Sequence, residues 1–87
     1  MKVKDTTEPS MQELNQIYKD VIRTFPKDPV FSKQSMRQRL SRVLRAIVNM
    51  DPQIGYVQGM NFVVAALLFH CSESVTFWLM RVLFEKF

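Results

Sequence analysis

The chain has 87 residues, a formal charge of +4 and an apolar content of 47%, which allow one small domain and argue against disorder over most of it. Its single cysteine excludes an internal disulfide and fits a reducing compartment, and no apolar run reaches the roughly 20 residues of a membrane helix. Because two glycines and four prolines leave little material for hairpin turns, we expect an all-α protein of about four helices.

A polar stretch at residues 1–9 precedes the first predicted helix, and we expect it to be a flexible N-terminal arm. Ser10 then stands where a helix N-cap would, and Glu13 follows three residues later, the spacing of a capping box. Six apolar residues recur after it at helical spacing and are expected to share one face: Leu14, Ile17, Tyr18, Val21, Ile22 and Phe25.

Two charged residues lie near the end of this helix. Arg23 falls on the side opposite the apolar face, so we expect its side chain to face water or a partner. Asp20 precedes it by three residues, within reach for an ion pair. The alternative for Arg23 is a solvated arginine whose charge complements the helix dipole in the last turn.

The segment 26–29 contains two prolines, which stop the first helix and predict an extended connector. Ser32 or Ser35 can cap the next helix, which we expect to run to about Met50. Its predicted buried stripe consists of Met36, Leu40, Val43, Leu44, Ile47 and Val48.

Basic residues occupy the other side of that second helix. They fit either a nucleic-acid-binding surface or a solvated basic face. No nucleic-acid motif is present, and the aromatic residues lie at core-like positions rather than between the basic ones, so we favour the solvated face and expect no nucleic-acid partner. The residues concerned are Arg39, Arg42 and Arg45, with Arg37 near the edge.

The most hydrophobic stretch, Phe62–Phe69, follows the segment 53–60. A helix that is apolar on every side belongs in a core, so we expect a buried central helix with Gln58 at its N-terminal mouth, where unpaired N–H groups suit an anionic ligand. Gln58 carries both a donor and an acceptor, and the chain's only glycines, Gly55 and Gly59, flank it. The alternative is that Gly55 closes a turn and Gln58 simply caps the helix.

The last predicted helix begins after His70 and Cys71, which are too few ligands for a metal site and lack an orienting partner for nucleophilic chemistry. Ser72 is expected to cap the helix, with Glu73 in its first turn. The helix has two apolar faces, so we expect either an N-terminal piece of a longer helical domain or self-association through this helix. One face consists of Val75, Trp78, Leu79 and Val82, and the other of Phe77, Met80, Phe84 and Phe87.

Two motifs in order carry a resemblance to a known family. Residues 17–24 match the pattern I-x-x-D-x-x-R-T and residues 56–60 match Y-x-Q-G-M, with the pairs 25–26 (Phe-Pro) and 77–78 (Phe-Trp) after them. Together they resemble the TBC domain of Rab GTPase-activating proteins. The resemblance covers residues 10–87 and implies the N-terminal part of a larger all-helical domain, truncated at its C-terminal end.

The resemblance implies that Arg23 is an arginine finger and Gln58 a glutamine finger, both supplied in trans to a Rab-type GTPase in its GTP-bound state. Asp20, Tyr56, Thr24 and Gly59 match the supporting residues. GTP and Mg²⁺ would be held by the GTPase, so the chain needs no cofactor or metal of its own and is an activator rather than an enzyme by itself.

The resemblance further implies a cytoplasmic protein of vesicle trafficking, at endomembrane surfaces through peripheral rather than transmembrane association. The family's C-terminal helical lobe is absent from these residues, so we expect the chain alone to be weak or inactive. The rival interpretation is a non-catalytic helical scaffold that binds a GTPase or another helical partner.

Overall fold

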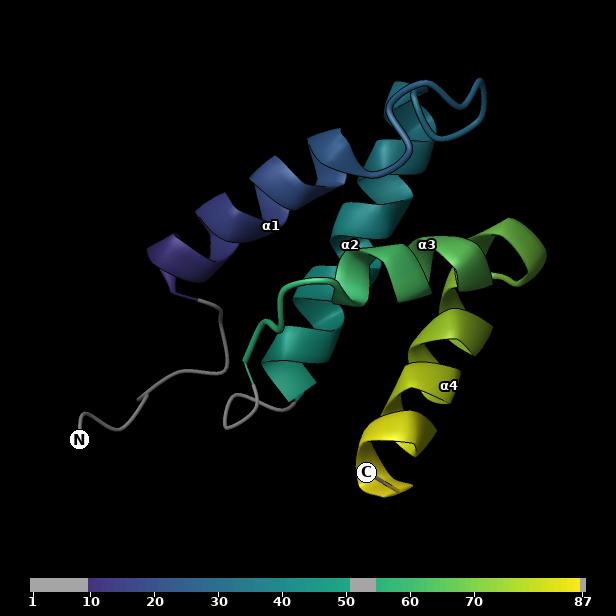
Figure 1. The fold of residues 1–87 in the computed structure, drawn as a ribbon. Coiled ribbons are helices and arrows are strands. Elements are labelled where there is room, and N and C mark those ends of the chain that lie inside the picture. Colours follow the sequence, from purple (N-terminus) through teal and green to yellow (C-terminus); the bar gives the residue numbers. More distant parts are fainter. Residues whose placement is uncertain (1–9, 51–54, 87) are drawn as a thin grey trace.

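In a computed structural model of the protein, residues 10–50 and 55–86 are described, and these form four helices and no strand, as expected (Figure 1). The helices are α1 (Met11–Arg23), α2 (Gln34–Met50), α3 (Met60–His70) and α4 (Glu73–Lys86). α2 packs against all three others, α3 also contacts α1 and α4, and α1 and α4 lie on either side of α2 (Figure 1). The predicted arm at residues 1–9 lies outside the described residues.

α2 forms the centre of the core because one of its faces is apolar along its whole length. All six residues predicted for that face are buried, and Leu44 and Val48 have no exposed surface. They join Ile17 and Val21 of α1 and Val64 of α3 in one hydrophobic cluster. Full burial of such side chains contributes about 1.5–3 kcal/mol each, so α2 holds the other helices together.

α1 begins as predicted, because the Ser10 side chain accepts from the Glu13 amide and the Glu13 side chain accepts from the Ser10 amide. The predicted apolar face is wrong in its orientation, however, since Tyr18 is 68% exposed and Ile22 is also exposed. The side of α1 that faces inward carries Asp20 instead, next to the buried Ile17 and Val21.

The connector between α1 and α2 consists of successive turns, which corrects the expected extended segment. The Asp28 carboxylate accepts from the amides of Val30 and Phe31 at 2.8 and 3.2 Å, and these bonds fold the chain so that Phe31 is buried. Because α2 begins at Gln34, neither Ser32 nor Ser35 occupies its N-cap position, and that prediction is wrong.

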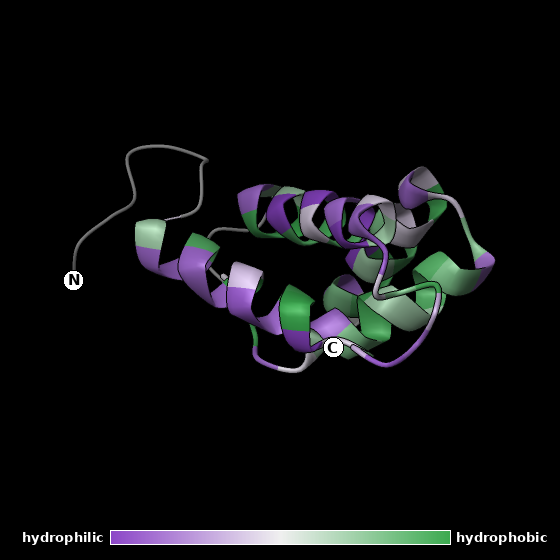
Figure 2. Ribbon diagram, turned by 90° about the horizontal axis from the view of Figure 1, so that it is seen from above, coloured by the Kyte–Doolittle hydropathy of each residue, from purple (hydrophilic) through white to green (hydrophobic). Residues whose placement is uncertain are grey.

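α3 is only half buried, which corrects the expectation of a fully buried central helix. Hydropathy colouring shows α1 and α2 alternating between hydrophilic and hydrophobic residues, whereas α3 is hydrophobic almost throughout (Figure 2). Its inward face, including Val64 and Leu68, meets the core, while Phe62, Val63 and Phe69 are about half exposed. Within the described residues, every helix that contacts α3 packs against that inward face.

α4 is capped by Ser72, whose hydroxyl accepts from the Val75 amide at 3.2 Å, as predicted. One of its two predicted apolar faces packs inward through Met80, Phe77 and Phe84. Phe87, the fourth residue predicted for this face, lies outside the described residues. On the other face, Trp78 is 61% exposed. No helix in residues 10–50 and 55–86 combines the length and hydropathy that crossing a membrane requires.

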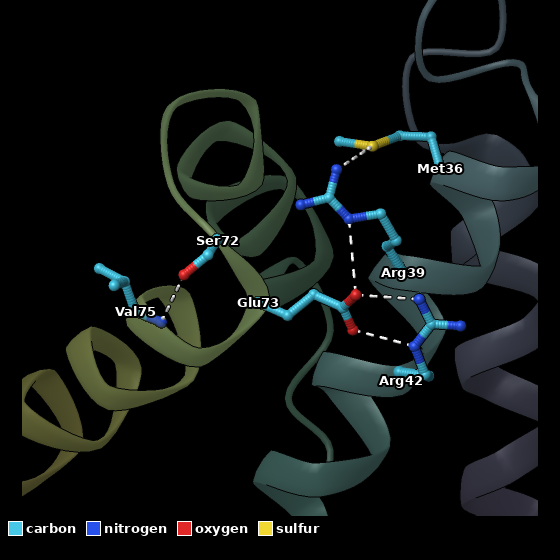
Figure 3. A network of polar contacts seen from close by, with 6 residues as sticks. All are labelled: Met36, Arg39, Arg42, Ser72, Glu73 and Val75. Carbon is cyan, nitrogen blue, oxygen red and sulfur yellow. Dashed lines mark hydrogen bonds and ion pairs between the residues drawn. The ribbon is translucent and has the colours of Figure 1, made fainter.

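A surface ion pair joins α2 to α4. The Arg42 guanidinium donates from Nε and a terminal nitrogen to the two Glu73 oxygens, both at 2.9 Å, and Arg39 Nε lies 3.6 Å from the same carboxylate (Figure 3). These hydrogen bonds from Arg42 lower the pKa of the Glu73 carboxyl. Two of the basic residues on α2 are therefore paired with an acidic residue, although the basic face remains at the surface, as expected.

We expect Leu44→Ala to lower the free energy of unfolding by about 2–5 kcal/mol, because truncation of a fully buried leucine leaves a cavity between α2 and its neighbours. Urea denaturation measures this change. Leu83→Ala is the matched control, since Leu83 is 42% exposed and its loss creates no internal cavity. Equal effects of the two substitutions would contradict the placement of α2 at the centre.

We expect Glu73→Gln to lower the melting temperature by a few degrees at most at pH 7, because the pair lies at the surface. The folded pKa of Glu73 is below its ordinary 4.5, so the pair stabilises the fold above that pH and the contribution is lost as pH falls through the lower folded value. Wild type and variant should therefore converge at a pH low enough to protonate Glu73 in the folded state, well below 4.5, or in about 1 M salt.

The control for this comparison is Glu85→Gln, because Glu85 pairs with Arg81 only within α4, at 3.8 Å. Thermal melts of the three proteins at both pH values decide the outcome. A difference between wild type and Glu73→Gln that persists unchanged at low pH would show that the ion pair is not its cause.

Candidate functional site

The last turn of α1 places its polar side chains in opposite directions. Asp20 is 6% exposed and points inward, whereas Arg23, the final residue of the helix, is exposed. The expected ion pair between them is not formed among the described residues, so that prediction is wrong. The Asp20 carboxylate instead accepts from the Tyr56 hydroxyl at 2.5 Å and from Gln16 Nε2 at 3.0 Å.

The Asp20–Tyr56 bond links α1 to the segment that precedes α3. Burial, together with the bond to Asp20, raises the pKa of the Tyr56 hydroxyl well above its ordinary value of 10. The hydroxyl therefore stays protonated at neutral pH and remains a donor to the carboxylate. A buried carboxylate is stable only with such donors, so Asp20 holds Tyr56 next to α1.

A second contact joins the same two segments one helical turn further along. Asn61, in the first turn of α3, donates from Nδ2 to Thr24 Oγ1 at 2.8 Å and to the Asp20 carbonyl at 3.3 Å. Thr24 caps the end of α1 and donates its hydroxyl to the same carbonyl at 2.5 Å. All three residues are buried, so these bonds are shielded from water.

Glu13 adds a third link at the other end of α1. Its Oε2 accepts from the Tyr56 amide at 3.2 Å, while its Oε1 serves the capping box. Gly55 allows this approach, because it adopts a φ of +66° and a Cβ at that position would lie 2.7 Å from Glu13 Oε2. Gly55 thus does more than close a turn: its missing side chain lets Glu13 reach the Tyr56 backbone.

Gln58 lies in the turn before α3, and its side chain is exposed. The N-cap of α3 is Gly59, with a φ of +100° and no side-chain cap, so the alternative in which Gln58 caps the helix is wrong. The turn is closed by backbone atoms, since the Met60 amide donates to the Val57 carbonyl at 3.1 Å. The Gln58 carboxamide therefore has no structural task in the described residues.

These contacts bracket both predicted functional residues. Asp20 and Thr24 lie on either side of Arg23, and Tyr56 and Asn61 lie on either side of Gln58. Because each residue of the first pair is bonded to one of the second, the structure ties the segment that carries the guanidinium to the segment that carries the carboxamide. Such an arrangement can present a fixed charge and a neutral donor–acceptor group to one ligand.

Sequence reasoning missed Asn61, Gln16 and the contact from Glu13 to Tyr56. Asn61 carries a visible signal, because it is the only polar residue from Met60 to Phe69. The spacing of Glu13 from Ser10 predicts only its role in the capping box, and it gives no sign of the contact with Tyr56. Within the described residues, no three His, Cys, Asp or Glu side chains are grouped so that they could hold a metal ion.

Comparisons with known proteins identify the family of the chain. The family model of the Rab-GTPase-TBC domain matches residues 1–87. Small G protein signaling modulator 3 of Homo sapiens is 38% identical over 85 residues, which are 95% of this chain and 11% of that protein. Its Xenopus laevis homolog is 44% identical over 72 residues, 80% of this chain and 10% of the relative.

The chain thus spans about a tenth of the length of these relatives. No solved structure is a significant match to it. The family match, by contrast, extends over every residue and includes the segments 20–24 and 56–61 that carry Arg23 and Gln58. The chain therefore belongs to the Rab-GTPase-TBC domain family.

Proposed function

We propose that this chain accelerates GTP hydrolysis by a Rab-family GTPase and supplies Arg23 and Gln58 in trans. One observation carries the proposal: both side chains are exposed, and each emerges from a segment that buried hydrogen bonds tie to the other. The names of the relatives refer to small G protein signalling, which supports a small GTPase as the partner. The GTPase in its GTP-bound state would hold the nucleotide and Mg²⁺.

Arg23 is suited to the charge that develops on the phosphates. Phosphoryl transfer is catalysed mainly by positioning and by stabilisation of negative charge, and a guanidinium is planar, permanently charged and forked. An arginine finger contributes about 10³–10⁵ in rate, or roughly 4–7 kcal/mol. Asp20 and Thr24 support Arg23 because they fix the end of α1, and no acidic partner among the described residues neutralises the guanidinium.

Gln58 would orient the attacking water. Its carboxamide can accept a hydrogen bond from that water and donate one to phosphate, as a charged side chain cannot. Tyr56 supports this residue from one side, and Gly59 supplies the backbone conformation that turns the chain into α3. The positive end of the α3 dipole lies next to the turn and favours an anionic ligand.

The finer parts of the proposal follow from the family. The activity belongs to vesicle trafficking, with a cytoplasmic protein that meets its GTPase at an endomembrane surface. Assayed alone, these 87 residues should stimulate hydrolysis weakly or not at all, so the activity is to be measured with the full-length protein. The exposed face of α4 around Trp78 makes self-association a further property to test by sedimentation.

We expect Arg23→Lys to remove most of the stimulated GTP hydrolysis, because lysine keeps the charge but lacks the fork that contacts two oxygens at once. Arg23→Ala should lower the rate by about 10³-fold or more. Single-turnover GTP hydrolysis by a panel of Rabs, stimulated by the full-length protein, measures the rates of both variants.

Arg45→Lys is the matched control, since Arg45 is an exposed arginine of α2 and lies outside the segments 20–24 and 56–61. It should leave the rate unchanged. Near-normal stimulation by Arg23→Lys and Arg23→Ala would show that Arg23 is not a finger.

We expect tighter binding to a Rab that carries GDP with aluminium fluoride than to the same Rab with GDP alone, because the fluoride complex mimics the transferring phosphoryl group. The difference should be lost in Gln58→Ala and Arg23→Ala, which lack the groups that contact it. Isothermal titration of the three proteins with each nucleotide state measures the six affinities. Equal affinity of the wild-type protein for both nucleotide states favours the alternative function, a non-catalytic scaffold that binds the GTPase.

A further inference from the structure

Asn61 is a polar residue placed where the surrounding sequence predicts an apolar one. It lies on the inward face of α3 between Met60 and Val64, and it is 2% exposed. Its Nδ2 reaches across to α1, where it donates to Thr24 Oγ1 and to the Asp20 carbonyl. The side chain is therefore the only hydrogen-bonded link from α3 itself to α1 among the described residues.

Stability alone gives no reason for an amide at this position. The Asn61 Oδ1 atom is buried and has no hydrogen-bond partner in the described residues, and a buried unpaired acceptor destabilises a fold. The Asp20 carbonyl and the Thr24 hydroxyl already bond to each other, so neither needs Asn61 to be satisfied. An apolar residue of similar size would fill the same space without a stranded oxygen.

We propose that Asn61 is a positioning residue that fixes where Gln58 lies relative to Arg23, an inference that rests on the function proposed above. Tyr56 holds the turn of Gln58 from the upstream side only. Downstream, the Met60 amide and sulfur bond to Val57, and these contacts close the turn on itself without tying it to α1. The directional bonds of Asn61 link that downstream side to α1, which apolar contacts between the helices do without fixing a register.

The test is Asn61→Leu, made in the protein as the cell makes it and assayed with a panel of GTP-loaded Rabs. We expect the maximal rate at saturating protein to fall by about tenfold to a hundredfold, because small misplacements of reacting groups have effects of that order. The concentration that gives half of the maximal rate should change much less. The melting temperature should stay within a few degrees of wild type, which separates positioning from a loss of folding.

Asn15→Leu is the matched control, since Asn15 is exposed on α1 and makes none of these contacts. A second variant keeps the test decisive if Asn61→Leu fails to fold. Asn61→Ala removes the same two hydrogen bonds and introduces no larger side chain. We expect the maximal rate to fall in this variant as well.

The failure of this inference can be told apart from the failure of the proposed function. If Arg23→Ala and Gln58→Ala both keep normal stimulation, the proposed function is wrong. If both lose it while Asn61→Leu folds and keeps the wild-type maximal rate, only the positioning role is overturned. A folded Asn61→Ala that keeps the wild-type maximal rate overturns it as well.

Discussion

The arrangement of the site depends on one buried carboxylate. Asp20 is almost fully enclosed, a situation that is unfavourable for a carboxylate unless hydrogen-bond donors surround it. Tyr56 and Gln16 supply those donors. This requirement turns the polar side of α1 inward, draws the segment before α3 against it, and leaves Arg23 at the surface. The exposure of Arg23 is thus a consequence of where its neighbour is buried.

The core and the site have separate tasks in so small a chain. α2 supplies a continuous apolar face, and the other three helices pack around it. The polar contacts between α1 and the start of α3 are then made on this platform, where low local polarity strengthens them. A fixed relative position of two exposed groups needs both parts, since the apolar contacts hold the helices together and the hydrogen bonds set their register.

Apolar side chains that remain exposed include Phe62 and Phe69 of α3 and Trp78 of α4. Phe62 and Phe69 pack against the rings of Phe25 and Phe31 in the α1–α2 connector, yet both stay about half exposed. The connector therefore covers the outward side of α3 only in part, which explains why the expectation of a fully buried α3 is wrong. A hydropathy pattern indicates that a helix has apolar sides, but it does not identify the segments that cover each side.

The sequence by itself determined the four helices, the buried stripe of α2, the caps at Ser10 and Ser72, and the two motifs, because these depend on spacing along one helix. Only the tertiary structure decided the orientation of α1, the partner of Asp20 and the role of Asn61. Those features depend on which segments, about 40 residues apart, approach each other closely enough to exchange hydrogen bonds. Periodicity predicted an apolar face containing Tyr18, but the structure buries Asp20 and exposes Tyr18, and the donors that allow this burial include a residue of a distant segment that no local pattern contains.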